Sequence, residues 1–153
     1  MRKVVGGAAF AFLLLGFSRE AHAQRSEDVT YVSPGITLGA TRGDFTAGGE
    51  ISLGQAHLFY VPITWYGAYA DFVYDNGREN GRVSIGPQGG LGPIGLDGGL
   101  VMSTDGRAGG CARVVAGLPF LMGYLRGNVM DDPRASFLFE VGLLVKAPTR
   151  LER

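Results

Sequence analysis

The chain has 153 residues, with 14 Lys and Arg against 14 Asp and Glu, and 46% of its residues are hydrophobic. This length allows one domain, and the balanced charge gives no electrostatic attraction to nucleic acid or to an anionic membrane surface. The single cysteine, Cys111, cannot form an internal disulfide, which excludes a disulfide-stabilised scaffold.

The first 23 residues are typical of a secretory signal peptide. Two basic residues precede an apolar run over residues 4–17, and Ala21-His22-Ala23 supplies a cleavage site of the small-x-small type. The apolar run is shorter than the ~20 residues that a membrane-spanning helix needs. We therefore expect cleavage after Ala23. The remaining chain, from Gln24, then carries a net charge of −2.

Beyond this segment, apolar residues alternate with small or polar residues in eight short runs. Side chains on a strand point to opposite faces in turn, so each run predicts a strand with one apolar and one mixed face. Glycine supplies 26 residues, a frequency that disfavours helices. The expected strands, with ends placed to within ~2–4 residues, span 30–40, 45–56, 62–74, 81–90, 93–103, 107–117, 119–129 and 135–147.

The last run shows the alternation most clearly. Its apolar positions, at every second residue, are Phe137, Phe139, Val141, Leu143 and Val145. The runs over 62–74 and 119–129 are aromatic on both parities, which leaves their register open by one residue. Pro87 lies inside a run, where it cannot donate a ladder hydrogen bond, and we expect a β-bulge there.

The connections between the runs alternate in character. Odd-numbered connections are polar, whereas the even-numbered ones are apolar and tight, except that residues 56–61 continue the strand pattern. An up-and-down barrel would separate the two sets onto opposite ends. The polar connections lie at 42–44, 75–82, 103–107 and 130–134, and the tight ones at 89–93 and 117–119.

These patterns predict an all-β fold, an eight-stranded antiparallel up-and-down β-barrel over residues 30–147. The expected domain plan is a cleaved signal peptide at 1–23, a short N-terminal segment at 24–29, the barrel, and a polar C-terminal tail at 148–153. A strand of ~10 residues with a rise of ~3.3 Å, tilted about 40°, spans roughly 25 Å, the height of the apolar band of a membrane barrel.

Composition indicates which face points outward. The outer face of a water-soluble barrel should be about 25–35% charged, but here the mixed face is mostly small residues with scattered charges. Small residues suit the narrow interior of an eight-stranded barrel. We expect the scattered charges to lie in the lumen and to pair, because isolated buried charges are costly. These candidates are Glu50, Asp71, Arg82, Asp97, Arg113, Glu140 and Lys146.

Several aromatic residues lie toward the ends of the expected strands. Such residues are typical of the girdles where a membrane barrel meets the two interfaces with water. Ordinary packing in the barrel interior is the alternative for each of them. The candidate interfacial aromatics are Tyr31, Trp65, Tyr66 and Tyr124.

The signal segment, the strand count, the side-chain parity and the alternating connections together resemble the small eight-stranded outer-membrane β-barrels of Gram-negative bacteria. The resemblance covers residues 30–147 and rests on architecture. It implies residence in the outer membrane, with the lipid bilayer as partner. Members of that group usually end in a strand with a terminal aromatic residue, whereas this chain continues through residues 147–153 without one.

The sequence offers little for catalysis. His57 is the one histidine after the signal segment, which excludes a multi-histidine metal site, and no serine neighbours it in sequence. Asp131-Asp132, Asp105 and Asp75 match no cation-binding loop. Cys111 has lumen parity, which favours a packed thiol over a reactive one. We therefore expect no enzyme activity, no cofactor and no metal.

The functional expectation is a non-enzymatic outer-membrane barrel with a side-chain-filled lumen and a structural or surface role. One alternative is a soluble periplasmic or secreted barrel that binds a small apolar ligand inside. A less favoured alternative is a lipid-modifying outer-membrane enzyme that uses His57. The sequence indicates neither a protein partner nor an oligomeric state.

Overall fold

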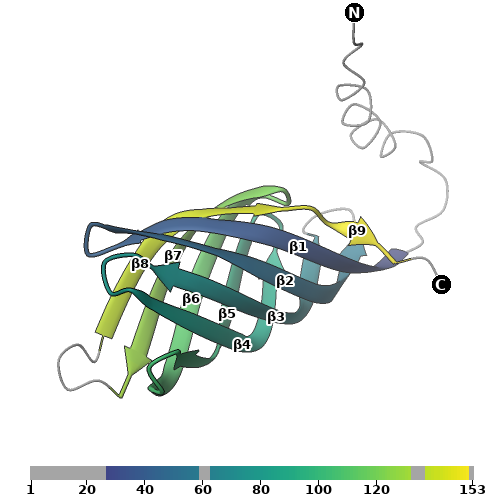
Figure 1. The fold of residues 1–153 in the computed structure, drawn as a ribbon. Coiled ribbons are helices and arrows are strands. Elements are labelled where there is room, and N and C mark those ends of the chain that lie inside the picture. The colour runs from purple at the N-terminus through teal and green to yellow at the C-terminus, as the bar shows by residue number, and fades with distance from the viewer. Residues whose placement is uncertain (1–26, 59–62, 132–136, 152–153) are drawn as a thin grey trace, which may run out of the picture.

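The computed structural model describes residues 27–58, 63–131 and 137–151. They form a closed barrel of eight antiparallel strands, which confirms the predicted fold class (Figure 1). No helix within the described residues is long and apolar enough to span a membrane. The strands are β1 Glu27–Thr41, β2 Asp44–Leu58, β3 Thr64–Asp75, β4 Asn80–Leu91, β5 Ile94–Ser103, β6 Ala108–Leu118, β7 Leu121–Met130, β8 Phe137–Lys146 and the short β9 Thr149–Arg150.

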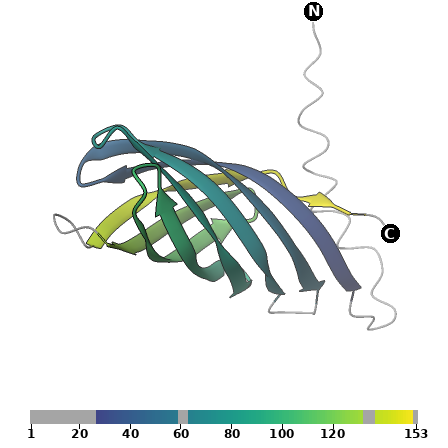
Figure 2. The same ribbon diagram turned by 60° about the horizontal axis from the view of Figure 1, so that its bottom comes forward.

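Each of β1 to β7 pairs with the next strand along the chain, and β1 closes the barrel by pairing with β8 from Gly35↔Lys146 to Thr41↔Glu140. Figure 2 shows the tilted strands from a second side. The signal peptide predicted at 1–23 lies outside the described residues. β2 continues to Leu58, in line with the strand pattern of 56–61, and residues 59–62 are not described.

The segment after β8 continues the wall of the barrel. β9 pairs with β1 in the same register as β8, and only Ala147 and Pro148, which has no amide hydrogen to donate, separate the two. The Ala147 amide donates to the Pro34 carbonyl at 2.9 Å, and the Leu151 amide donates to the Thr30 carbonyl at 2.9 Å. The expected polar tail at 148–153 is thus partly a strand.

The registers define how strongly the strands are staggered. Following the cross-strand partners once around the barrel, from Tyr31 on β1, leads back to β1 at Thr41, ten residues further along. A stagger of this size corresponds to a strand tilt of roughly 40° and an interior wide enough only for side chains. The successive partners on this path are Gly54, Gly67, Gln88, Asp97, Arg113, Arg126 and Glu140.

The bulge predicted at Pro87 is wrong. The β4–β5 ladder is interrupted at residues 86–87, opposite 98–99, but the pairs Ile85↔Leu100 and Gln88↔Asp97 keep one register on both sides. A bulge needs an extra residue on one strand, and none is inserted here. Pro87 points outward and is exposed, so its missing donor leaves a gap in the ladder without bending the strand pairing.

The structure also fixes the two registers that the sequence left open. In β3 the buried positions are Tyr69, Asp71, Val73 and Asp75, and in β7 they are Tyr124, Arg126, Asn128 and Met130. All of these side chains alternate with exposed or partly exposed neighbours. Each strand therefore has one inward and one outward face, like the other six.

Candidate functional site

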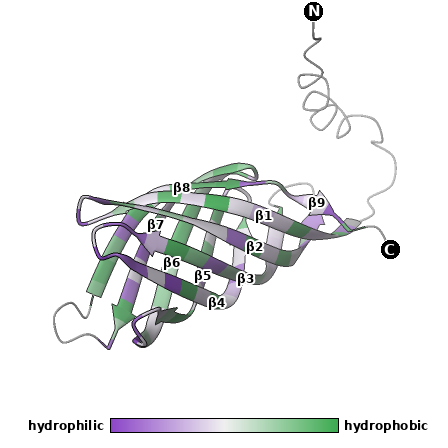
Figure 3. Cartoon of the chain, in the orientation of Figure 1, coloured by the Kyte–Doolittle hydropathy of each residue, from purple (hydrophilic) through white to green (hydrophobic). Residues whose placement is uncertain are grey.

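The outer wall of the barrel is apolar. Within the described strands, Asp28, at the start of β1, is the one Asp, Glu, Lys or Arg at an outward position. The alternation is visible along the strands in Figure 3. Exposed large apolar residues on β4 to β8 include Val83, Ile85, Leu96, Leu100, Met102, Val114, Leu125, Phe139, Val141 and Leu143. This arrangement is the reverse of a water-soluble protein, where large apolar patches are rare.

The structure places all seven predicted lumen charges on the inner face of the barrel. It adds an eighth, Arg126, which is 2% exposed and lies on a strand whose register the sequence left open. With Arg126 included, the described lumen holds four cations and four carboxylates from this set. These eight charges therefore balance one another at a depth where an unpaired ion would be costly, and Asp75 is a further buried carboxylate at the end of β3.

Three ion pairs cross the lumen. Glu50 on β2 meets Arg113 on β6 at 2.7 Å, and Asp71 on β3 meets Arg126 on β7 at 2.7 Å. The third pair joins Arg82 and Glu140, on β4 and β8, at 2.5 Å. Each pair connects strands four apart, which are opposite walls in an eight-stranded barrel. The centre of the lumen is therefore bridged by side chains in three directions.

Further contacts tie these pairs into one network. Arg113 also contacts Asp97 at 2.7 Å, and Lys146 contacts Glu50 at 2.5 Å. The guanidinium of Arg113 lies 5.1 Å from the ring centre of Tyr69, within cation–π range. Charge-assisted contacts of this kind are stronger than neutral hydrogen bonds, and they hold long side chains in one geometry.

Two apolar clusters flank the charged layer. One comprises Val101, Cys111, Met130 and Leu138, toward the end with the odd-numbered connections. The other, toward the opposite end, comprises Val115, Tyr124 and Leu144, with Trp65 and Met122 packed against it. The inner side chains are thus layered as apolar, charged and apolar along the barrel axis, and they fill the lumen.

Three of the four candidate interfacial aromatics point into the barrel and not toward the membrane interfaces, contrary to the prediction. Tyr124 is 3% exposed, and its hydroxyl donates to Glu140 at 2.5 Å inside the barrel. Trp65 points inward and donates to the Gly92 carbonyl at 3.3 Å. Tyr31 also has inward parity and lies over Gly54. The interior accepts these rings because glycines on neighbouring strands leave room for them.

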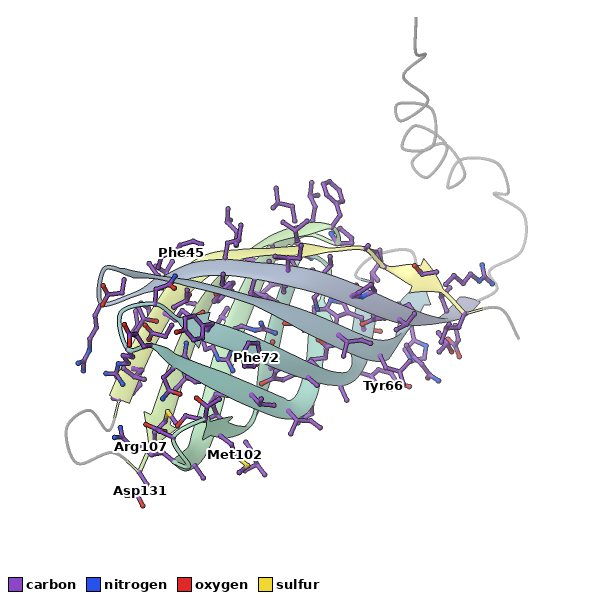
Figure 4. The ribbon with its side chains drawn as sticks, viewed as in Figure 1. Phe45, Tyr66, Phe72, Met102, Arg107 and Asp131 are labelled. Carbon is purple, nitrogen blue, oxygen red and sulfur yellow. The ribbon has the colours of Figure 1, made fainter. Side chains whose placement is uncertain are left out.

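Only Tyr66 of the four faces outward, where it is 50% exposed. Figure 4 shows it toward one end of the barrel, with Arg107 and Asp131 at the other. Further exposed aromatics lie on the outer face of β2, β3 and β8: Phe45, Phe72, Tyr74, Phe137 and Phe139. Their parity, opposite to that of the charged residues on the same strands, is the signal that identifies them.

The buried position of Tyr124 depends on two neighbouring glycines, Gly39 and Gly142, whose lack of side chains leaves room for its ring. A methyl group at Gly142 would lie 2.7 Å from the Tyr124 ring and 2.7 Å from the backbone of Gly39. We expect Gly142→Ala to destabilise the barrel by about 1–3 kcal/mol through overpacking. Gly123→Ala is the matched control, because its methyl group would meet nothing nearer than 3.8 Å. Urea titration of both variants in lipid vesicles measures the difference, and equal stabilities would contradict the packing.

His57 lies on the outer wall, away from the lumen. Its Nδ1 contacts the carboxylate of Asp28, and its ring is 5.5 Å from the ring of Tyr66. The Tyr66 hydroxyl in turn donates to Gln55 at 2.7 Å. This small polar group sits at the end of the barrel where β1 begins and β2 ends, so it is separate from the charged network.

The other candidate chemical groups are occupied or dispersed. Cys111 is buried and contacts the Tyr69 hydroxyl at 3.3 Å. At the end with the odd-numbered connections, the Ser103 hydroxyl donates to Asp105 and holds the pKa of that carboxyl below its ordinary value. Within the described residues, no group of His, Cys, Asp and Glu is placed to hold a metal ion.

A small recess opens at this end, lined among others by Asp75, Arg82, Ser103, Met130 and Leu138. Small-molecule sites are usually larger and mainly apolar, with a few polar groups. The lining here is mostly polar and charged. The recess therefore does not match the apolar ligand cavity of a soluble carrier barrel.

Comparisons with known proteins add little to this geometry. No family model matches the chain, and no curated protein matches it. Among solved structures, the chain is similar to one from a study described as "De novo design of transmembrane beta-barrels". That match has 11% sequence identity and a TM-score of 0.41, and it covers 80% of this chain and 100% of the other.

Proposed function

We propose that this protein is a non-enzymatic outer-membrane β-barrel with a structural or surface role and a lumen that conducts no solutes. The observation that carries the proposal is the partition of its side chains. Large apolar residues cover the outside, while the eight charges of the lumen network are paired with one another. A lipid bilayer solvates such an apolar outer surface favourably, whereas water does not.

Strand dimensions support membrane residence. β5, β7 and β8 have 10 residues each. At ~3.3 Å per residue and a tilt of roughly 40°, such strands span roughly 25 Å of hydrocarbon. Closure by β1 and β8 leaves no strand edge facing lipid along that height, and a closed barrel satisfies its backbone without help from water.

Cell fractionation tests the location. We expect the protein in detergent-extracted outer membranes, as a band whose gel mobility changes after heating. A monomer recovered from the soluble periplasmic fraction or the medium would overturn the membrane proposal. Recovery there would favour the soluble ligand-binding barrel instead.

Single-channel recording tests the filled lumen. The three ion pairs that cross the barrel bridge opposite walls, so we expect no stable conductance steps after reconstitution into planar bilayers in 1 M KCl. A purified eight-stranded barrel is narrow in any case. Reproducible ohmic conductance from the folded protein would show that the network does not close the lumen.

The non-enzymatic part of the proposal has its own test. His57 has a carboxylate partner in Asp28, but a nucleophile would also need to lie within hydrogen-bond reach of the ring, and among the described residues no such contact is found. We expect His57→Ala to leave the membrane lipid profile unchanged. A changed acyl-chain or lysolipid content in that variant would revive the enzyme alternative.

A further inference from the structure

The two halves of the barrel depend on each other for charge pairing. The N-terminal half, β1 to β4, contributes Glu50, Asp71 and Arg82 to the charged network. Each of the three forms its ion pair with a residue of the C-terminal half, β5 to β8. Among the described contacts, no ion pair joins two of these three residues to each other. These three charges of the N-terminal half are therefore neutralised by the other half.

Like charges are neighbours within each wall. Glu50 and Asp71 are direct cross-strand partners on β2 and β3, and Arg113 and Arg126 are direct partners on β6 and β7. Like charges directly opposite each other destabilise a strand pair. The carboxylate pair faces the arginine pair across the lumen, at 2.7 Å for both cross-lumen contacts. Closure thus turns two repulsive pairs into a complementary set.

The distances restrict which closed form satisfies the charges. Barrel diameter grows with strand number, so a domain-swapped barrel with more strands would move opposite walls beyond the reach of these side chains. An open sheet would leave the acidic pair without the arginine wall and would expose the edges of β1 and β8 to pairing with another chain. Of these forms, only the closed eight-stranded barrel brings both walls together.

We propose that the charge-complementary walls select closure of the eight-stranded barrel over open sheets and over swapped barrels with more strands. The acidic pair on β2 and β3 and the basic pair on β6 and β7 act as a recognition device between the two halves of one chain. The network is therefore more than lumen filling, because it specifies how the sheet closes.

Charge reversal at one cross-lumen pair tests the proposal. Asp71→Arg places a third arginine near Arg113 and Arg126, and Arg126→Asp places a third carboxylate near Asp71 and Glu140. Combining the two reversals restores an opposite-charge pair across the lumen. The double variant loses the same native packing contacts as the two single variants together, so recovery in the double variant reports charge complementarity.

Closure itself is measured at the β1–β8 seam. Leu38 and Leu143 are cross-strand partners on the outer face of that seam. Cysteines are placed at both positions in a Cys111→Ala background, and the protein is refolded from urea into lipid vesicles. A short bis-maleimide reagent then gives an intramolecular cross-link in a closed barrel and intermolecular cross-links in open or swapped assemblies.

We expect each single reversal to reduce the intramolecular cross-link at least about tenfold, in keeping with the cost of an unpaired buried charge. The double reversal should return to within about threefold of the parent. A double variant no better than the single ones would overturn the proposal, as would single variants that close like the parent. Reversal of the exposed pair Asp105 and Arg107, which are 39% and 40% exposed, is the control and should leave closure unchanged.

Discussion

Replacing Glu140 with leucine is expected to lower the free energy of unfolding by about 3–5 kcal/mol, because it leaves a buried cation without its partner. Glu140 is fully buried; it pairs with Arg82 at 2.5 Å and accepts the hydroxyl of Tyr124 at 2.5 Å. Leucine can replace neither contact. In a soluble barrel of opposite orientation, position 140 would face water, and the same change would be nearly neutral.

Urea titration of the protein in lipid vesicles, followed by the heat-modifiable band, measures this loss. Glu140→Gln is the graded comparison, since it keeps hydrogen-bonding capacity but removes the charge, and it should fall between leucine and the wild type. Val141→Leu, at the neighbouring outward position that is 50% exposed, should be close to neutral. Wild-type stability for Glu140→Leu would mean that Arg82 is solvated by water and that the lumen is open.

An arginine in the middle of the outer wall should be nearly as damaging. Leu125 lies near the middle of β7, points outward and is 49% exposed. In a bilayer, arginine at the midplane of a barrel costs about 2–4 kcal/mol, and near the interfaces the cost falls to about 0–1 kcal/mol. We therefore expect Leu125→Arg to lower stability and to reduce the fraction of protein that inserts into vesicles.

Leu121→Arg is the matched control for depth. Leu121 begins the same strand, faces the same side and is 43% exposed, so it should tolerate arginine with little loss. If both variants were as stable as the wild type, the outer wall would be facing water, and the membrane proposal would fail. A difference between them that depends on depth has no counterpart in a soluble barrel.

The strands were predictable because strand formation in this chain follows a period of two. The predicted strand at 135–147 and the observed β8, Phe137–Lys146, end within one residue of each other. Turn residues such as Gly43, with φ of 94°, mark the boundaries well. Closure followed from the even strand number and the alternating connections, which are properties of the sequence alone.

The register of β7 was less predictable, because Tyr124 and Leu125 are equally plausible as inward residues by polarity. Choosing wrongly there hides Arg126 from the lumen and assigns Tyr124 to the interface. The charge balance of the predicted set indicates the register of β7. The seven predicted lumen charges were three positive and four negative. A fourth cation on an ambiguous strand completes the set, and Arg126 is that residue.

The partners within the network could not be predicted from the sequence. Which carboxylate meets which guanidinium depends on the ten-residue stagger, which sets the strands that face each other and the height at which they do so. Glu50 meets Arg113 because four successive registers bring β2 opposite β6 at that level. A one-residue error in any of these four strand registers would change which residues meet across the lumen.

The seam between β1 and β8 has a consequence for folding kinetics. Its partners Gly35 and Lys146 stand at nearly opposite ends of the barrel sequence. Contacts of such long range are slow to form, since the entropy of closing the loop is lost before any stabilising contact is gained. The first strand completes its ladder only when the last one has come alongside it, so we expect closure of this seam to be a late step of folding.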